Sequence, residues 1–256
     1  MSLTPDRLYV MSATEIINAL ADSARAAART LNVATGAERA AALNVIADAI
    51  TARSAEIIAA NEEDMVRARA ADINASLLDR LLLTQARVEG IANGARQVSQ
   101  LPDPLGITLR HSTLTNGIDL QQITVPFGVI GMVYEARPNV TVDAAVILLM
   151  SGNAALLRGS SSAASSNQIL VTVMRDALKS TKISPDVIQL IPSDDRDTVK
   201  ALLNARGKVD LVIPRGSASL IRMAMILLQK DKPLTLISLV RPPHFNQVVQ
   251  MLQKLA

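Results

Sequence analysis

Residues 129–157 decide the fold, and they read VIGMVYEARPNVTVDAAVILLMSGNAALL. The apolar run 129–134 predicts a buried strand, 140–150 predicts a helix, and 154–157 predicts a second buried strand. Short apolar strands separated by helices are typical of right-handed βαβ units in a parallel sheet. Ligands of such sheets bind beyond the carboxyl ends of the strands, so we expect a site in the loops that follow them.

The same alternation continues toward the C-terminus. Further strands are expected at 187–191, 209–213 and 234–240, and further helices at 163–178, 195–204 and 218–229. The sequence therefore predicts the α/β class, with a doubly wound, mostly parallel, Rossmann-like sheet.

The chain before this region is helical. Ala-rich stretches with charged residues three and four positions apart predict helices from Ser12 to about Gln100. Ser12 or Thr14 followed by Glu15 resembles an N-cap, and Gly36 marks a break between the first two helices.

An antiparallel ribbon is expected next. Pro102 and Pro104 end the helical region, and Asn116-Gly117 lies between two alternating runs. That dipeptide predicts a hairpin in which both turn residues have positive φ. We therefore expect four parts: a helical layer at 1–104, a β-hairpin at 105–126, a Rossmann-like cofactor-binding domain at 127–223 and a divergent tail at 224–256.

The composition excludes several function classes. The 256 residues contain no Cys and two His, which leaves no disulfide, no thiol chemistry and no metal site built on several His. Aromatic residues make up 2% and the net charge of +3 is scattered, so nucleic-acid binding is disfavoured. Asp143 interrupts the longest apolar run and the first ten residues lack a signal-peptide pattern, so we expect no membrane partner and a cytoplasmic protein.

The loop after the first strand carries three polar side chains. Asn139 is able to donate to a developing oxyanion, Arg137 to hold a phosphate or carboxylate, and Glu135 adds a carboxylate. The alternative interpretation is that Pro138 starts the helix and that Glu135 and Arg137 are solvated.

Two further loops have a design that suits phosphate. In the loop after the second strand, Arg158 supplies charge, and Gly159 and Ser160 supply backbone access and hydroxyls, with helix N–H groups behind them. This set suits a ribose 2′-phosphate, hence NADP(H), although a Ser-rich N-cap explains it equally. Gly216 and Ser217 repeat the design one unit later, and no Gly-x-Gly-x-x-Gly motif occurs.

Several segments of the sequence resemble the gamma-glutamyl phosphate reductase family of the aldehyde dehydrogenase superfamily. The resemblance runs from about Ser12 to Met223 and is carried by 61–64, 77–81, 125–131, 134–141, 152–159 and 209–217. It implies an NADPH-dependent reduction of L-glutamyl 5-phosphate to L-glutamate 5-semialdehyde, with phosphate release, in proline biosynthesis. It also implies that Asn139 binds the oxyanion and that Glu135 and Arg137 lie on the substrate side. The implied cofactor-binding residues are Arg158, Gly159, Ser160, Gly216 and Ser217.

The sequence departs from the family in two respects. The family's nucleophile is a Cys thiolate in a second α/β domain, and this sequence has no Cys. From about Ala224 the resemblance stops, and 241–246 only faintly echoes the family's Arg-Pro-x-x-Cys-Asn motif, with Phe245 in place of the sulfur. We therefore expect a truncated chain that is inactive alone. A missing domain leaves an apolar surface on the rest of the chain. This surface is covered by dimerisation, by packing of the tail, or not at all.

Three function classes stay open on the sequence. The first is a chain of reductase ancestry that binds NADPH and a small-molecule substrate. The second is a non-catalytic nucleotide-binding or assembly module, and the third is an unrelated α/β protein that binds a phosphate ligand.

Overall fold

The computed structural model describes residues 11–135, 137–218, 220–222 and 235–236. Its α-helices are α1 (Ala13–Leu31), α2 (Gly36–Ala52), α3 (Ser54–Ala70), α4 (Ala75–Leu81), α5 (Gln85–Ser99), α6 (Pro138–Met150), α7 (Ala164–Leu178) and α8 (Asp197–Leu203). The strands are β1 (Thr108–Thr113), β2 (Asp119–Ile123), β3 (Val129–Tyr134), β4 (Ala154–Arg158), β5 (Ile188–Leu190), β6 (Leu211–Arg215) and β7 (Thr235–Leu236). Two short 3₁₀ turns are η1 (Ser161–Ala163) and η2 (Pro185–Val187).

The main sheet is parallel and doubly wound, as the sequence predicts. Its strand order is β5-β4-β3-β6-β7, and every neighbouring pair is parallel. The chain runs outward from β3 through β4 to β5 and then returns to place β6 on the other side of β3. The direction of winding therefore reverses between β3 and β6, and a crevice for ligands is expected at the carboxyl ends of these two strands.

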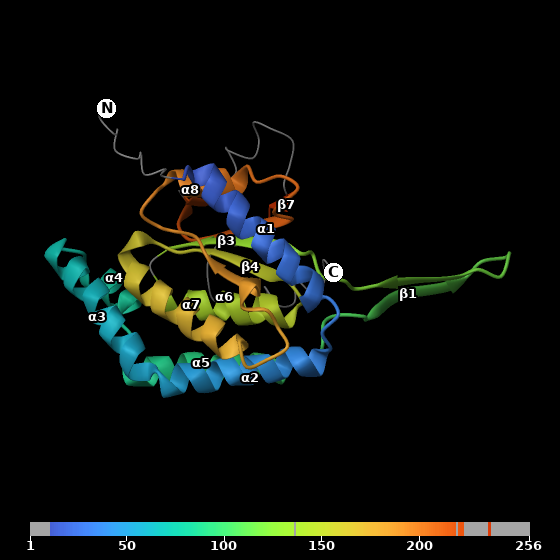
Figure 1. Cartoon of the computed structure of the whole chain (residues 1–256), viewed down its shortest axis with the longest axis horizontal. Helices are drawn as coiled ribbons and strands as arrows, with labels where there is room; N and C mark the ends of the chain where they lie inside the picture. Colours follow the sequence, from blue (N-terminus) through green and yellow to red (C-terminus); the bar gives the residue numbers. More distant parts are fainter. Residues whose placement is uncertain (1–10, 136, 219, 223–234, 237–256) are drawn as a thin grey trace, which may run out of the picture.

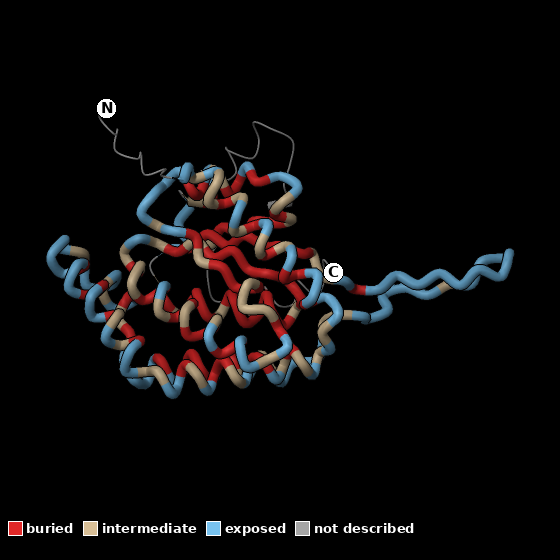
Figure 2. The backbone as a smooth tube through the Cα atoms, viewed as in Figure 1, coloured by how far each residue is buried: buried red, intermediate tan, exposed pale blue. Residues whose placement is uncertain are grey.

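Helices cover both faces of the sheet (Figure 1). α6 and α7 lie on one face and are backed by α2 and α5, whereas α1 and α8 lie on the other face. All six residues of β3 are buried, as Figure 2 shows for the centre of the molecule. Because both faces are covered, the strands are continuous apolar runs rather than alternating ones.

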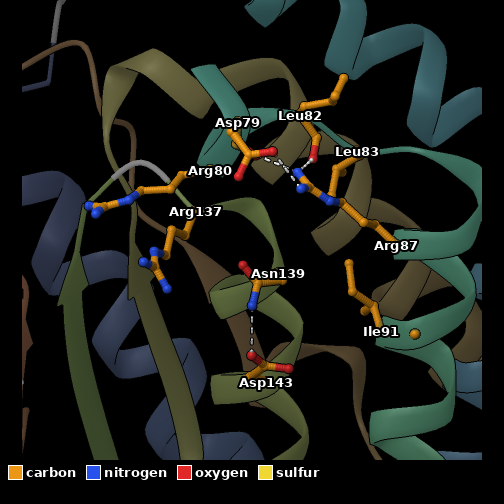
Figure 3. Close-up of a pocket in the computed structure, with 10 residues that line it drawn as sticks. Asp79, Arg80, Leu82, Leu83, Arg87, Ile91, Arg137, Asn139 and Asp143 are labelled. Carbon is orange, nitrogen blue, oxygen red and sulfur yellow. Dashed lines mark hydrogen bonds and ion pairs between the residues drawn. The ribbon is translucent and has the colours of Figure 1, made fainter. Parts of the chain in front are cut away.

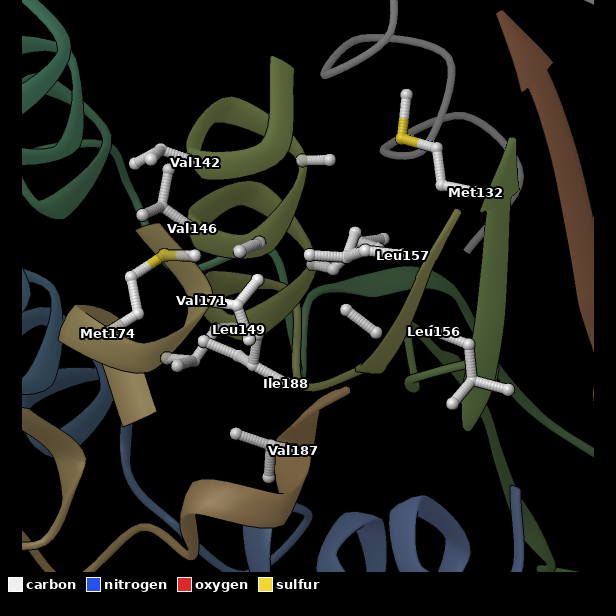
Figure 4. Close-up of a cluster of buried hydrophobic side chains, with 14 of the residues drawn as sticks. Met132, Val142, Val146, Leu149, Leu156, Leu157, Val171, Met174, Val187 and Ile188 are labelled. Atoms are coloured by element: carbon white, nitrogen blue, oxygen red, sulfur yellow. The ribbon is translucent and has the colours of Figure 1, made fainter. Parts of the chain in front are cut away.

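One hydrophobic core joins the sheet to its helices. Figure 4 shows Leu157 of β4, Val146 and Leu149 of α6, and Val171 and Met174 of α7 in this core. Leu157, in the strand next to the central β3, has no exposed surface. The core also includes residues of α1, α2 and α5, so the N-terminal helices pack as part of the same body.

The predicted helix starts are largely confirmed. Ser12 and Glu15 form a capping box, in which Ser12 Oγ accepts from Glu15 N at 3.3 Å and Glu15 Oε2 accepts from Ser12 N at 2.8 Å. The prediction for Gly36 was inexact, because Gly36 is the first residue of α2 and the break precedes it. Thr35 caps α2 there with its own capping box.

The predicted hairpin is confirmed, but its turn is not the predicted one. β1 and β2 pair antiparallel and extend away from the body in Figure 1. Gly117 has φ +85°, whereas Asn116 does not have positive φ. Leu114 N donates to Ile118 O at 2.8 Å, and Gly117 N donates to Leu114 O at 2.9 Å. This is a three-residue loop ending in a left-handed glycine, for which one residue with positive φ is enough.

The C-terminal predictions are covered only in part. Residues 218 and 220–222 are helical and β7 covers 235–236, within the expected helix 218–229 and strand 234–240. The rest of the tail, including the motif at 241–246, lies outside the described residues.

Candidate functional site at the sheet switch point

The loops after β3 and β6 lie side by side where the winding reverses. Tyr134, the last residue of β3, is the register partner of Arg215, the last residue of β6. A Cβ on Gly216 would lie 2.7 Å from Glu135 Cδ, so glycine is what lets the two loops approach this closely. Parallel pairing thus brings together two loops that are 81 residues apart in the sequence, and the sequence had predicted both as site loops.

A cavity of about 490 Å³ opens beside this point, between α4, α5 and the start of α6 (Figure 3). Its lining contains two of the predicted residues, Arg137 and Asn139. The other lining residues are Asp79, Arg80, Leu82, Leu83, Arg87, Gly90, Ile91 and Asp143. Most of the lining therefore comes from helices that the sequence analysis interpreted as a structural layer.

Asn139 is bonded to a carboxylate one helical turn further on. Its Nδ2 donates to Asp143 Oδ2 at 3.2 Å. Burial raises the pKa of Asp143 to about 6, while the positive charge of Arg215 and the bond from Asn139 act in the opposite direction. Burial, and then the positive charge of Arg137, lowers the pKa of Arg215. The oxyanion candidate therefore lies within a compact group of charges.

The cavity has an excess of unpaired positive charge. Arg87 forms an ion pair with Asp79 at 2.7 Å and also donates to Leu82 O at 2.9 Å. The side chains of Arg80 and Arg137 form no hydrogen bond or ion pair with the described residues, and Figure 3 shows them at the same side of the cavity. Two free guanidinium groups beside a side-chain amide favour an anionic small molecule with a polarised carbonyl or phosphoryl group.

A second, smaller cavity of about 180 Å³ lies at the carboxyl ends of β4 and β5. Its lining includes Gly159, Asn167, Pro192, Ser193 and Asp194. A Cβ on Gly159 would lie 2.2 Å from Asn167 Nδ2, so glycine is required there by packing within the protein.

The Arg158 side chain is hydrogen-bonded to two residues that line this second cavity, Gly159 and Ser193. Its Nη1 donates to Gly159 O at 3.0 Å, and its Nη2 donates to Ser193 O at 3.4 Å and Asp195 O at 3.3 Å. Its Nε is buried without a hydrogen-bond partner. Burial, followed by the positive charge of Arg196, lowers the pKa of Arg158. The Arg158 guanidinium is therefore short of one acceptor and lies near a second cation.

The backbone N–H groups at the start of α7 already have acceptors within the chain. Ser160 Oγ accepts from Ser162 N at 3.2 Å, as in the N-cap alternative. Asp64 of α3, which has no exposed surface, accepts from Ser165 N at 3.2 Å and Ser166 N at 2.8 Å. The expectation that helix N–H groups of this loop are open to phosphate is therefore wrong for Ser165 and Ser166. Of the groups expected to bind phosphate in this loop, Arg158 and the serine hydroxyls remain as candidates.

Asp79, Arg80 and Asp143 line the cavity but were not predicted from the sequence. Asp79 and Arg80 lie in the segment 77–81, which was noted only for its resemblance. Asp143 carried a clearer signal, because it is the one charged residue in the apolar helix segment 138–150. A lone carboxylate in an otherwise buried helix indicates a polar surrounding that the sequence does not identify.

In the described residues, no cluster of three or more His, Asp or Glu side chains is arranged to hold a metal ion. No helix in that same part of the chain has the length and apolar character to cross a membrane.

Comparison with known proteins identifies relatives. The model of the aldehyde dehydrogenase family matches residues 8–236. The gamma-glutamyl phosphate reductase of Thermobifida fusca is 50% identical over 206 residues, which are 80% of this chain and 49% of the relative. The enzyme of that name from Kineococcus radiotolerans is 49% identical over 222 residues, or 87% of this chain and 51% of the relative. The chain thus spans about half the length of these relatives.

Solved structures agree in fold. The crystal structure of gamma-glutamyl phosphate reductase from Thermotoga maritima superposes with a TM-score of 0.82 at 34% identity, over 86% of this chain and 52% of that one. The yeast protein of the same name, from Saccharomyces cerevisiae, gives a TM-score of 0.78 at 29% identity, over 89% and 56% of the two chains. With the family model matched along most of its length, the chain belongs to the aldehyde dehydrogenase family.

Proposed function

We propose that this chain is part of an NADPH-dependent gamma-glutamyl phosphate reductase of proline biosynthesis. Such an enzyme reduces L-glutamyl 5-phosphate to L-glutamate 5-semialdehyde and releases phosphate. The observation that carries the proposal is the cavity at the switch point, which is lined by Asn139 and by Arg80 and Arg137, two residues whose side chains have no partner among the described residues. The names of relatives at about 50% identity support the same reaction.

In this proposal the cavity binds the substrate. Arg80 and Arg137 neutralise carboxylate or phosphate oxygens, because a guanidinium pairs with either anion through two parallel hydrogen bonds. Asn139 donates to the acyl oxygen as negative charge develops on it. Glu135, exposed beside Gly216, is a further group on the substrate side.

The second cavity fits the adenosine end of the cofactor. Arg158, with its orphaned Nε and its neighbour Arg196, suits a ribose 2′-phosphate, and Gly159 and Ser160 form the adjoining loop. Gly216 and Ser217 begin the next segment after β6, and they are assigned to the pyrophosphate and nicotinamide side. NADPH supplies a hydride when it is bound.

The chain as given has no Cys, so we propose that it does not turn over by itself. Serine is a poor replacement, because its hydroxyl is not ionised at neutral pH without an adjacent base. His111 lies in the exposed hairpin, away from the cavity, and His244 lies outside the described residues. What remains for this half is binding and polarisation of the ligands.

Cofactor preference tests the Arg158 assignment. We expect tighter binding of NADPH than of NADH in calorimetry, because a charge-assisted contact contributes about 1.5–3 kcal/mol. Arg158→Ala should remove this preference, and Arg69→Ala is a matched control because Arg69 is exposed and paired with Glu62 on α3. Equal affinity of the unmodified chain for the two cofactors contradicts the assignment.

Turnover tests the proposal that sulfur is required. Purified chain, glutamate semialdehyde, phosphate and NADP are followed at 340 nm, with an iodoacetamide-treated sample to remove contaminating enzyme. We expect no rate above that control. A rate that survives iodoacetamide and disappears in Asn139→Ala would overturn it.

A second candidate, a non-catalytic nucleotide-binding or assembly module, is favoured by the absence of Cys. Glutarate and inorganic phosphate are stable probes that separate the two. Reductase ancestry with a retained substrate cavity predicts that one or both bind and that Arg80→Gln with Arg137→Gln weakens them. NADPH binding without any binding of either probe favours the module.

A further inference from the structure

We propose that Asp143 is a positioning residue for Asn139, and that its carboxylate determines which atoms of the Asn139 amide face the cavity. The purpose of this arrangement rests on the oxyanion role proposed above. The arrangement itself concerns only these two side chains and their surroundings, so it is testable without substrate or cofactor.

The geometry places the two groups on one face of α6. Residues four positions apart in an α-helix lie one above the other, and Asn139 Nδ2 is 3.2 Å from Asp143 Oδ2. Figure 3 shows the amide nitrogen turned down the helix toward Asp143, while the amide oxygen faces the opposite way, toward Asp79 and Arg80. Both residues line the cavity.

The chemistry of the two groups makes the orientation depend on charge. An ionised carboxylate only accepts hydrogen bonds, so it selects the orientation in which the amide nitrogen faces it. The second N–H of Asn139 is then left to donate to a ligand. A neutral carboxyl group is also able to donate to the amide oxygen, so both orientations of the amide become satisfied and the selection is lost.

The surrounding charges keep this carboxylate close to its ionisation point. Around Asp143, Arg215 enters from β6, Arg137 from the loop before α6, Asp79 and Arg80 from α4, and Arg87 from α5. Asp79 and Arg87 pair with each other, which leaves a net positive surrounding that favours the carboxylate. Burial favours the neutral form, and the balance leaves the pKa of Asp143 at about 6.

Two consequences follow for a ligand. Above about pH 6 the Asn139 amide is held in one orientation, and below it the orientation is released. A bound anion near Asn139 repels the ionised carboxylate, so anion binding is expected to raise the pKa of Asp143, and the two events are linked reciprocally.

The test follows the Asn139 side-chain amide by NMR in ¹⁵N-labelled chain without ligand, with its signals assigned by their loss in Asn139→Ala. Between pH 4.5 and 7.5 we expect both Nδ2 proton signals to shift with a midpoint near pH 6. At pH 7.5 the two protons should exchange with water at different rates, and at pH 4.5 the rates should converge.

Variants separate positioning from a general effect of charge. Asp143→Asn should abolish the midpoint, whereas Asp79→Asn, which removes a carboxylate of the same cavity that pairs with Arg87, should leave it in place. Asn139 signals that do not titrate, or a midpoint that persists in Asp143→Asn, would overturn the proposal. If Asp143→Asn fails to fold, the exchange rates of the unmodified chain decide alone, and equal rates at pH 7.5 reject it.

The outcomes stay distinct from those of the proposed function. A chain that binds neither NADPH nor the anionic probes but shows the Asn139 midpoint retains the positioning role and loses the reductase assignment. A chain that binds these ligands but lacks the Asn139 midpoint retains the reductase assignment and loses the positioning role.

Discussion

The β3–β6 pair of the main sheet and the β1–β2 hairpin are strand pairs of similar length with opposite surroundings. Every residue of β3 is buried, whereas every residue of β2 is exposed. The hairpin closes through a local loop at Gly117, but β3 and β6 meet only after the chain has passed through α6, β4, α7, β5 and α8. Backbone pairing is therefore possible without a core, but a site at strand ends needs the covered sheet, because the helices supply its walls.

The hairpin also exposes several large apolar side chains to solvent. Leu109 is 51% exposed and Leu120 54% exposed, and Ile118, Ile123 and Val125 are exposed as well. Several large apolar side chains exposed on one element are typical of an interaction surface. We expect a second copy of the chain to cover these side chains.

The largest change in the free energy of unfolding is expected from truncating a side chain in the buried sheet. Leu157→Ala removes a fully buried side chain between sheet and helices and should lower the free energy of unfolding by about 2–5 kcal/mol. Urea denaturation followed by circular dichroism measures this. A loss below about 1 kcal/mol would show that β4 is not part of the cooperative core.

A smaller and pH-dependent effect is expected at the edge of the buried region. Burial raises the pKa of Asp143 to about 6 from 3.8, so the folded state binds more protons than the unfolded state between these values, and ionised Asp143 lowers stability as the pH rises. Asp143→Asn should therefore raise the free energy of unfolding at pH 7.5 by about 2–3 kcal/mol and have little effect at pH 4.

Urea denaturation at the two pH values checks this. Asp176→Asn is the control with the opposite sign, because Lys179 and then Arg53 hold the pKa of that exposed carboxyl below its usual range. A stabilisation by Asp143→Asn that is equal at both pH values would mean that the carboxylate's charge is not its cause.

The smallest effect is expected in the hairpin. Leu120→Ser replaces a side chain that is 54% exposed and should change the free energy of unfolding by no more than about 0.5 kcal/mol. Sedimentation velocity of the same variant sharpens the comparison. If a second copy covers the ribbon, the unmodified chain sediments as an oligomer and Leu120→Ser shifts it toward the monomer. If the unmodified chain and Leu120→Ser both sediment as monomers, a second copy does not cover the hairpin.

The sequence by itself determined the succession of strands and helices along the chain, the parallel character of the sheet and the hairpin. It also indicated the loops after β3, β4 and β6 as candidate site loops. Each of these depends on local pattern: apolar runs of strand length, the 3.6-residue helix period, and Asn-Gly between alternating segments. Arg137, Asn139, Arg158 and Gly216 could be named as candidates because they lie in loops after predicted strands, and parallel strands bring such loops to one edge of the sheet. Their roles stay predictions.

Only the tertiary structure decided what surrounds those residues. Arg80 joins the site because α4 lies beside the start of α6, Asp143 is placed near Arg215 by the return of the chain to β6, and Asp64 of α3 caps α7. These partners are separated by 57 to 102 residues, and no periodicity within an element specifies its distant neighbour. Their contacts depend on how helices from different parts of the chain pack on the sheet, and packing is a property of the assembled core rather than of any one segment.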